Sequence, residues 1–262
     1  MRRTLVGLVT LALGAGLLLG VACGGGGDDE EADIEAAIRS AVEAYNSGNG
    51  DDFLARITDN FLAPFTKDEF REAVAAGEFA PGEPPLELSN ITDVEVSGDS
   101  ATAVTDIQEG RALTTQRLTL VRQADAWLLD GKEVLRVPAP EGATEVDMGL
   151  VEFAFNLAEL TFPAGDVAFQ AHNDGQQEHE LGIVKLPEGV TLQEALEAED
   201  LEAVGAEEVA FFEPIEPGAE ASWIVEDLEP GRYGYACFIS DADDPEGTPH
   251  ALKGMVGEFT VE

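Results

Sequence analysis

The part of the chain that follows residue 32 shows helical spacing first and strand-like alternation later. Apolar side chains return every three or four residues from Asp33 onward, which predicts a helix that ends at the Ser47–Gly50 turn: Ile34, Ile38, Val42 and Tyr45. A short helix that carries Phe53, Leu54 and Ile57 should open at Asp51 and Asp52. A third helix should begin with the capping box formed by Thr66 and Glu69 and stop at the next glycine.

Four runs with strand character follow these helices. They are separated by short turns of the hairpin type and cover residues 86–96, 101–108, 112–122 and 126–135. Helices followed by consecutive strands are typical of an α+β domain, in which the helices pack on an antiparallel sheet. We expect this domain to span residues 32–137.

A different pattern begins near Thr144 and continues to the last residue. Short apolar runs separated by Gly, Pro and Asp indicate a β-sandwich of two sheets. A second capping box, formed by Thr191 and Glu194, predicts a helix inserted between two of the strands. Because two prolines stiffen Val137–Pro140, we interpret residues 138–143 as a linker and 144–262 as a second domain.

The N-terminal residues have the pattern of an export signal. A basic start at Arg2 and Arg3 precedes an uncharged apolar run that ends at Cys23, and residues 24–31 form a Gly-rich acidic tether. Small residues directly before a cysteine resemble the signal of bacterial lipoproteins. The resemblance implies a signal peptide over residues 1–23, a lipid on Cys23 and an extracytoplasmic protein held at the cell membrane. An uncleaved apolar anchor, the alternative, would give the same location.

Charge restricts the partners. The formal net charge is −39, which argues against nucleic acid, whose phosphates bind Lys and Arg. Residues 138–262 carry 29 acidic and 3 basic side chains. Two interpretations remain: an acidic surface that keeps the protein soluble, or a field that steers it toward a basic partner.

The second domain contains a set of side chains that suit a soft metal. Cys237 ends one predicted strand, His250 ends the polar loop that follows, and Met255 starts the next strand. His179, in the strand–turn–strand segment 169–186, supplies a second imidazole. Thiolate and thioether suit Cu(I) while imidazole also suits Cu(II), and one Cys, two His and a weak Met form the ligand set of blue-copper sites.

The third histidine, His172, gives a contrast. Val167, Phe169 and Ala171 define the apolar face of its predicted strand, so His172 should point the other way. We expect His172 to be exposed to solvent and not to be a ligand.

The order of these residues resembles the cupredoxins, the family of plastocyanin and auracyanin, as do the segments NDG, EHELGIV, PGRYGYAC and GMVGEFTV. The resemblance covers Thr144–Glu262. It implies a Greek-key sandwich with one type 1 copper on His179, Cys237, His250 and Met255, which exchanges single electrons with a redox protein. Two features depart from the family: twelve residues separate Cys237 from His250 where the family has few, and Glu180 follows the first histidine in place of Asn or Ser.

Two other functions remain open, a copper storage or delivery protein and a metal-free module that binds a partner. We expect no enzyme activity, because the sequence has no Ser-His-Asp arrangement, phosphate loop or CxxC, and too few Cys and His for a second copper centre. If the surface steers a basic partner, the acids of Asp241–Glu246 are the expected docking patch, because they lie between two proposed ligands.

The first domain resembles the NTF2-like or cystatin-like domains. The resemblance rests on the order of its elements and on the segments TDNFLAPF and DAWLLDGKEVL. Some relatives are enzymes with acidic groups or histidine in a pocket, and Asp59, Asp93 and Asp106 are the corresponding candidate acids. Because residues 32–137 contain no histidine, we expect a binding or spacer module.

Overall fold

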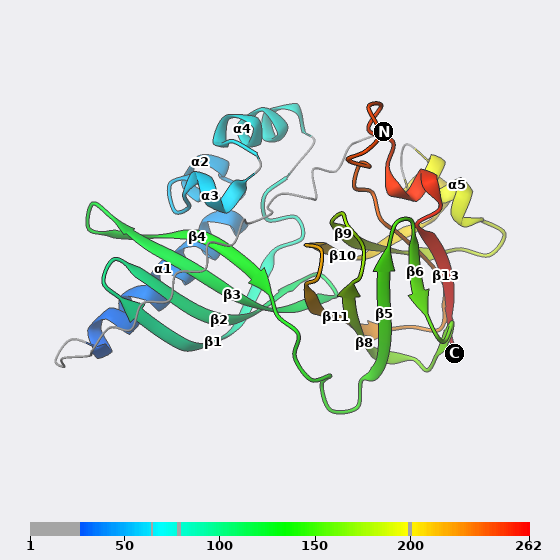
Figure 1. Cartoon of the computed structure of the whole chain (residues 1–262), viewed down its shortest axis with the longest axis horizontal. Helices are drawn as coiled ribbons and strands as arrows, with labels where there is room; N and C mark the ends of the chain where they lie inside the picture. The colour runs from blue at the N-terminus through cyan, green and yellow to red at the C-terminus, as the bar shows by residue number, and fades with distance from the viewer. Residues whose placement is uncertain (1–26, 64, 78–79, 199–200) are drawn as a thin grey trace. The chain divides into compact units, whose positions relative to one another are not determined.

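The computed structural model describes residues 27–63, 65–77, 80–198 and 201–262 (Figure 1). These residues form two compact units. One lies within residues 27–133, and the other contains residues 134–262 together with the turn segment 109–114. The predicted signal peptide, Cys23 and the first residues of the tether lie outside the described ranges. Within those ranges, no helix is both long and apolar enough to cross a bilayer.

The N-terminal unit begins with helices, as predicted, but the first of them starts earlier than expected. In the described ranges, four helices precede the sheet: α1 (Gly27–Asn46), α2 (Gly50–Leu54), α3 (Asp59–Leu62) and α4 (Lys67–Ala76). Residues 27–31, predicted as tether, are therefore helical. Acidic residues in a first turn interact favourably with the helix dipole, and Glu30 also pairs with Arg122 at 2.9 Å. The capping box of Thr66 and Glu69 is confirmed, and Gly77 ends α4 in a left-handed conformation.

Four strands follow in consecutive order: β1 (Leu86–Ser97), β2 (Ser100–Glu109), β3 (Ala112–Gln123) and β4 (Ala126–Val134). Burial alternates along β2 and β3, so one face of the sheet is covered. Ile34 and Ile38 of α1 share one buried cluster with Ala103, Leu118 and Leu120 of the sheet. The helices therefore lie on one face of the sheet, which is the predicted α+β arrangement.

The C-terminal unit consists of two sheets. The first has the order β11-β8-β5-β6 and the second β10-β9-β12-β13-β7. The strands of the first sheet are β5 (Thr144–Val151), β6 (Ala154–Leu157), β8 (Gly165–Asn173) and β11 (Glu220–Leu228). Those of the second are β7 (Thr161–Phe162), β9 (His179–Leu186), β10 (Glu207–Ile215), β12 (Gly231–Ala236) and β13 (Val256–Val261). β5 runs parallel to β8, and β13 parallel to β7.

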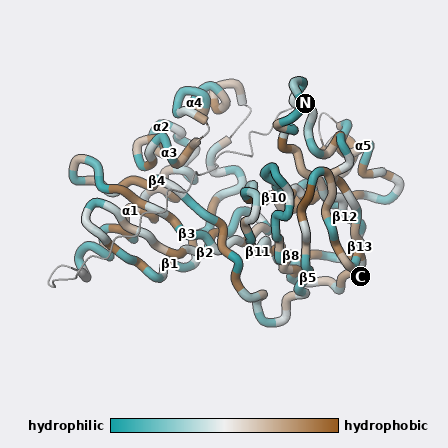
Figure 2. Tube along the Cα trace, viewed as in Figure 1, coloured by the Kyte–Doolittle hydropathy of each residue, from teal (hydrophilic) through white to brown (hydrophobic). Residues whose placement is uncertain are grey.

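Aromatic side chains from both sheets form the core between them. Trp223 of β11 stacks on Phe212 of β10 with ring centroids 5.7 Å apart, and Phe169 of β8 meets Phe259 of β13 at 6.0 Å. Figure 2 shows hydrophobic residues along these strands. The predicted insertion is present as α5 (Leu192–Glu197) and a 3₁₀ turn, η1 (Glu202–Val204), which pack in a small hydrophobic cluster with Leu186 of β9. In the second sheet, the start of β9 and the end of β12 lie next to the loops that carry the candidate ligands.

Candidate metal centre

The candidate ligands lie where three neighbouring strands of the second sheet begin or end. His179 is the first residue of β9, Cys237 follows the last residue of β12, and Met255 precedes the first residue of β13. His250 begins the 3₁₀ turn η2 (His250–Lys253). Because Ala236 pairs with both Gly182 of β9 and Val256 of β13, the sheet itself brings these ends together.

Backbone hydrogen bonds fix the segment that carries Cys237, His250 and Met255. The amide of Cys237 donates to the carbonyl of Met255 at 3.2 Å, and the amide of Met255 donates to the carbonyl of His250 at 3.0 Å. The amide of Ala251 donates to the carbonyl of Cys237 at 2.7 Å. The three residues therefore keep their spacing through the main chain, independently of any metal.

The donor atoms of His179, Cys237 and His250 all lie within 4.8 Å of one another, and the three side chains are fully buried. The Cys237 Sγ lies 3.4 Å from the His250 Nδ1, and the two imidazole rings are 5.0 Å apart between centroids. The structure thus brings together three of the four predicted ligands through their side chains. Met255 is buried beside them and is joined to them through the backbone bonds above.

The ring nitrogens of His179 test whether a metal fits. Both are buried and neither has a hydrogen-bond partner. The Nε2 lies 3.4 Å from an oxygen of Glu152, but this contact lacks the alignment of a hydrogen bond. A buried polar atom without a partner costs about 1–3 kcal/mol. With Nε2 facing Glu152, Nδ1 is the nitrogen left to face a metal, and ligation there would remove that cost.

The protonation states also fit. Burial, with a smaller contribution from His250, lowers the pKa of His179 to about 4, and burial lowers the pKa of His250 as well. Both imidazoles are therefore neutral near pH 7, the form that binds metals. Burial, and then the nearby Glu180, raises the pKa of Cys237 to about 12, so the metal-free protein holds a thiol. A metal must displace this proton when it binds.

Several residues around the cluster are not among the predicted site residues. The carboxylate of Glu152 accepts the amides of Gln176 and Gln177, both at 2.7 Å. A Cβ atom on Gly175 would lie 2.6 Å from Glu152 Oε1 and 2.9 Å from His179 Nε2, so this position needs glycine. Glu152 and Gly175 lie in turns, where no periodic pattern marks them, although Gly175 ends the NDG segment that resembles the cupredoxins.

Glu180, one of the two departures from the family, is buried in the same region. Its carboxyl accepts a hydrogen bond from the amide of Phe238 at 2.9 Å, and the residue is 2% exposed. Burial raises the pKa of Glu180 to about 8. Glu180 follows His179 and Phe238 follows Cys237, so this hydrogen bond links the chain next to two proposed ligands.

The acidic loop differs from its predicted role as a docking patch. Asp241 is 6% exposed, and both Asp241 and Asp244 pair with Lys253. Lys253 holds the pKa of Asp241 well below its usual range and lowers that of Asp244 to about 2. Only Asp243 and Glu246 among the four acids of this loop are exposed. The prediction failed for the other two because a single lysine from the neighbouring 3₁₀ turn neutralises both.

His172 lies outside the cluster, as expected, but it is only partly exposed. Its ring contacts Asp147 at 3.7 Å and Asp174 at 3.3 Å, and its side chain is 28% exposed. It belongs to β8 of the first sheet, whereas the cluster lies at the ends of strands of the second.

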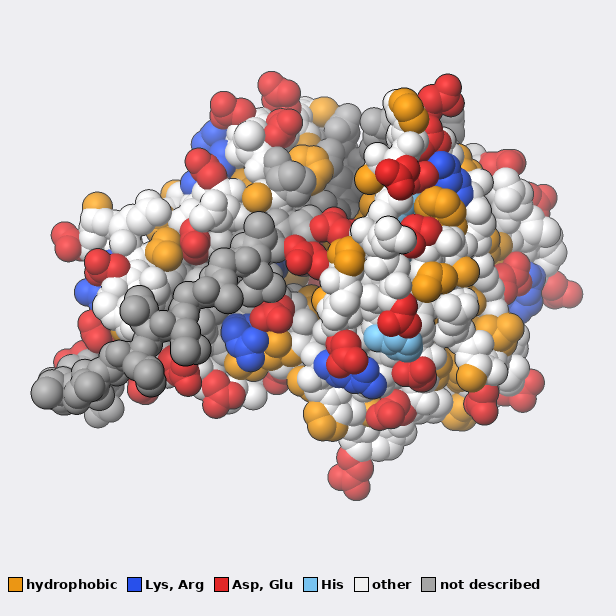
Figure 3. Space-filling view, in the orientation of Figure 1, with side chains coloured by type: hydrophobic (Ala, Val, Ile, Leu, Met, Phe, Trp, Pro, Cys, Tyr) orange, Lys and Arg blue, Asp and Glu red, His pale blue; other side chains and the backbone are white. Residues whose placement is uncertain are grey.

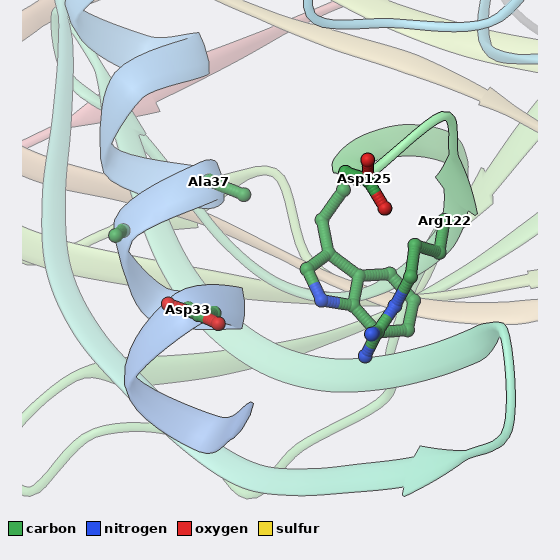
Figure 4. Close-up of a pocket in the computed structure, with 6 residues that line it drawn as sticks. Asp33, Ala37, Arg122 and Asp125 are labelled. Atoms are coloured by element: carbon green, nitrogen blue, oxygen red, sulfur yellow. The ribbon is translucent and has the colours of Figure 1, made fainter. Parts of the chain in front are cut away.

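The candidate acids of the N-terminal unit do not come together. Asp59 is exposed near Lys67, Asp93 lies within β1, and Asp106 accepts a hydrogen bond from Thr115 at 2.7 Å. None of them lines the pocket of about 360 Å³ on this unit, whose walls are Asp33, Ala36, Ala37, Arg122, Asp125 and Trp127 (Figure 4). The Arg122 guanidinium lies 4.5 Å from the centre of the Trp127 ring and pairs with Glu30.

Comparison of the sequence with protein-family models and with curated proteins gives no match. Similar solved structures include an auracyanin from Roseiflexus castenholzii. It is 25% identical in sequence, the match covers 46% of this chain and 99% of that chain, and the TM-score is 0.33. Auracyanin A from Chloroflexus aurantiacus is 20% identical, with a match that covers 46% of this chain and 100% of that chain and a TM-score of 0.31. An NTF2-like protein of unknown function from Shewanella oneidensis is 18% identical, with a match that covers 40% of this chain and 98% of that chain and a TM-score of 0.32.

Proposed function

We propose that this protein binds one copper ion through His179, Cys237 and His250, with Met255 as a weak axial ligand, and carries single electrons between extracytoplasmic redox partners. The observation that carries the proposal is the buried cluster in which two neutral imidazoles and one thiol converge while His179 lacks any hydrogen-bond partner. Bound copper would supply a one-electron couple between Cu(I) and Cu(II).

The protein's own contribution is to hold the donors in one arrangement. The backbone bonds among Cys237, His250 and Met255 do not depend on the metal, so neither oxidation state requires the loop to move. All four side chains are fully buried, which excludes water from the site. Such a closed site favours a retained ion over copper storage or delivery, which require the ion to enter and leave.

Electrochemistry of the copper-loaded protein tests this proposal. We expect a reversible one-electron response, and we expect Met255→Leu to raise the reduction potential, because an axial donor that favours Cu(II) is lost. Val256→Leu, at the next position in the chain, is the matched control and should leave the potential unchanged. A protein that binds copper stoichiometrically but shows no reversible response would be a storage or delivery protein.

We also propose that a lipid on Cys23 tethers the protein to the outer face of the cytoplasmic membrane. The proposal rests on the basic, apolar and small-residue order of residues 1–23. Two or more acyl chains make anchoring stable, whereas one gives marginal binding. The intact mass of the membrane-extracted protein decides between an acylated Cys23 and a chain that begins elsewhere without lipid.

The acidic surface supports a basic redox partner. Asp and Glu side chains are spread over the face shown in Figure 3, with few Lys or Arg between them, and Asp243 and Glu246 are exposed on the loop between two proposed ligands. A field of this kind acts on the rate of association, and it weakens as the Debye length falls from about 10 Å at 0.1 M salt to about 3 Å at 1 M.

Electron transfer to a cationic cytochrome should therefore slow steeply as salt is added. Asp243→Asn with Glu246→Gln should flatten this dependence. Glu141→Gln with Glu145→Gln, which removes the same charge, is the control and should flatten it less. Glu145 is the second residue of β5 and Glu141 lies just before that strand, so both are at least about 20 Å from the end of β5 that lies near Glu152. If the rate of electron transfer changes neither with salt nor with Asp243→Asn and Glu246→Gln, the acidic surface serves solubility alone.

A further inference from the structure

Gln177 lies between the proposed ligand His250 and the acidic loop. Its side-chain Nε2 donates to Asp241 Oδ1 at 2.7 Å, and its Oε1 accepts the amide of Ala242 at 2.7 Å. The same Oε1 lies 3.2 Å from His250 Nε2. The amide of Gln177 therefore bridges the carboxylate of Asp241 and the imidazole of His250.

The direction of these bonds is determined by the groups at the two ends. An ionised carboxylate can only accept hydrogen bonds, so the amide nitrogen of Gln177 must face Asp241. The backbone N–H of Ala242 can only donate, which places the amide oxygen of Gln177 on the other side. That oxygen also faces His250, and it attracts the ring only if Nε2 carries the proton.

The fixed position of Asp241 makes this arrangement rigid. Its Oδ1 also accepts the amide of Asp243 at 3.0 Å, and its Oδ2 pairs with Lys253, which in turn pairs with Asp244 at 2.9 Å. The carboxylate is 6% exposed, and Lys253 keeps it ionised by holding its pKa low. It therefore cannot turn or become a donor near neutral pH.

We propose that Asp241 and Gln177 are positioning residues that hold His250 in the Nε2–H tautomer, so that its Nδ1 lone pair faces Cys237. This inference rests on the proposed function, because it explains how His250 is made ready for a metal. The distance of 3.4 Å between Cys237 Sγ and His250 Nδ1 fits it, since the protonated thiol can donate to the bare Nδ1. The long loop between Cys237 and His250 then has a role: it carries Asp241 to the bridge.

The tautomer can be measured in the metal-free protein, where the outcome does not depend on copper. Two-bond ¹⁵N–¹H correlation spectra of the imidazoles near neutral pH show which ring nitrogen bears the proton. We expect Nε2–H for His250 in the full chain. Gln177→Leu removes the acceptor and should convert a large fraction of His250 to the other tautomer. Gln176→Leu, the same change at the exposed neighbouring position, should leave the tautomer unchanged.

Binding of Zn(II) alone, a metal without redox chemistry, gives the second readout. Loss of the partner that orients a ligating histidine typically weakens metal binding roughly 10- to 100-fold, which we expect for Gln177→Leu and not for Gln176→Leu. The charge-conserving exchange Gln177→Glu with Asp241→Asn should keep the Nε2–H tautomer. The amide introduced at position 241 can donate to the carboxylate introduced at position 177, and that carboxylate still accepts from His250. If the leucine variant does not fold, an Nδ1–H tautomer of His250 in this double variant would count against the bridge.

Two results would overturn the inference: an Nδ1–H tautomer of His250 in the parent protein, or an unchanged tautomer and Zn(II) affinity in Gln177→Leu. Neither result depends on whether the copper-loaded protein is blue. A correct tautomer in a protein that binds copper without colour would count against the proposed function and leave the positioning role intact.

Discussion

Cys237→Ser should abolish the intense thiolate-to-copper absorption band of the copper-loaded protein. The band requires a short bond between the metal and a sulfur ligand, and Cys237 is the one described cysteine, buried 3.4 Å from His250 Nδ1. A serine hydroxyl keeps nearly the same size but provides no soft donor. The measurement is the visible spectrum after addition of one equivalent of Cu(II).

Two histidine substitutions give the matched comparison for this prediction. His179→Ala removes a donor of the cluster and should also remove the band, whereas His172→Ala, on the other sheet, should keep the spectrum and the copper affinity of the parent. A band that survives Cys237→Ser, or that disappears with His172→Ala, would show that the ligands have been assigned incorrectly.

Glu180→Gln should stabilise the metal-free protein increasingly as the pH rises from 4.5 to about 8. Burial raises the folded-state pKa of Glu180, so folding favours the protonated carboxyl. Its contribution to stability is therefore complete below the ordinary pKa of 4.5, declines as the pH rises toward about 8 and stays low above it. Glutamine cannot ionise, yet its oxygen can still accept the amide of Phe238.

The expected size of this effect follows from the linkage between proton binding and folding. The free energy of unfolding of the parent should fall relative to Glu180→Gln by up to about 1.4 kcal/mol per pH unit, on the order of 5 kcal/mol across the whole range. Urea unfolding of both proteins at several pH values measures the difference. Glu188→Gln, at an exposed loop position, is the control and should give a curve parallel to that of the parent. Parallel curves for Glu180→Gln as well would mean that Glu180 is not buried as the structure shows.

Periodic segments of this chain could be predicted well from the sequence. The predicted strands at 86–96, 101–108, 112–122 and 126–135 match β1 to β4 within two residues at each end. Both capping boxes are present because their hydrogen bonds join residues three apart, which is visible in the sequence itself. Cys237 directly follows a strand, close to the strand end expected for it, and His179 lies within the predicted strand–turn–strand segment.

The surroundings of the cluster could not be predicted in this way. Glu152 reaches Gln177 from 25 residues away, and Gln177 reaches Asp241 from 64 residues away. Such contacts join turns without periodicity, so the sequence offers no signal for them. The same limit explains why the sequence predicts Asp241 as part of a docking surface although Asp241 is buried against Lys253.

The most direct test of the central claim is the colour and metal content of the purified protein after addition of Cu(II) and removal of excess metal. We expect one copper per chain and an intense absorption band in the visible range, which is lost on reduction and recovered on reoxidation. An oxidised protein that holds one copper per chain yet stays colourless, or one that retains no copper, would contradict it.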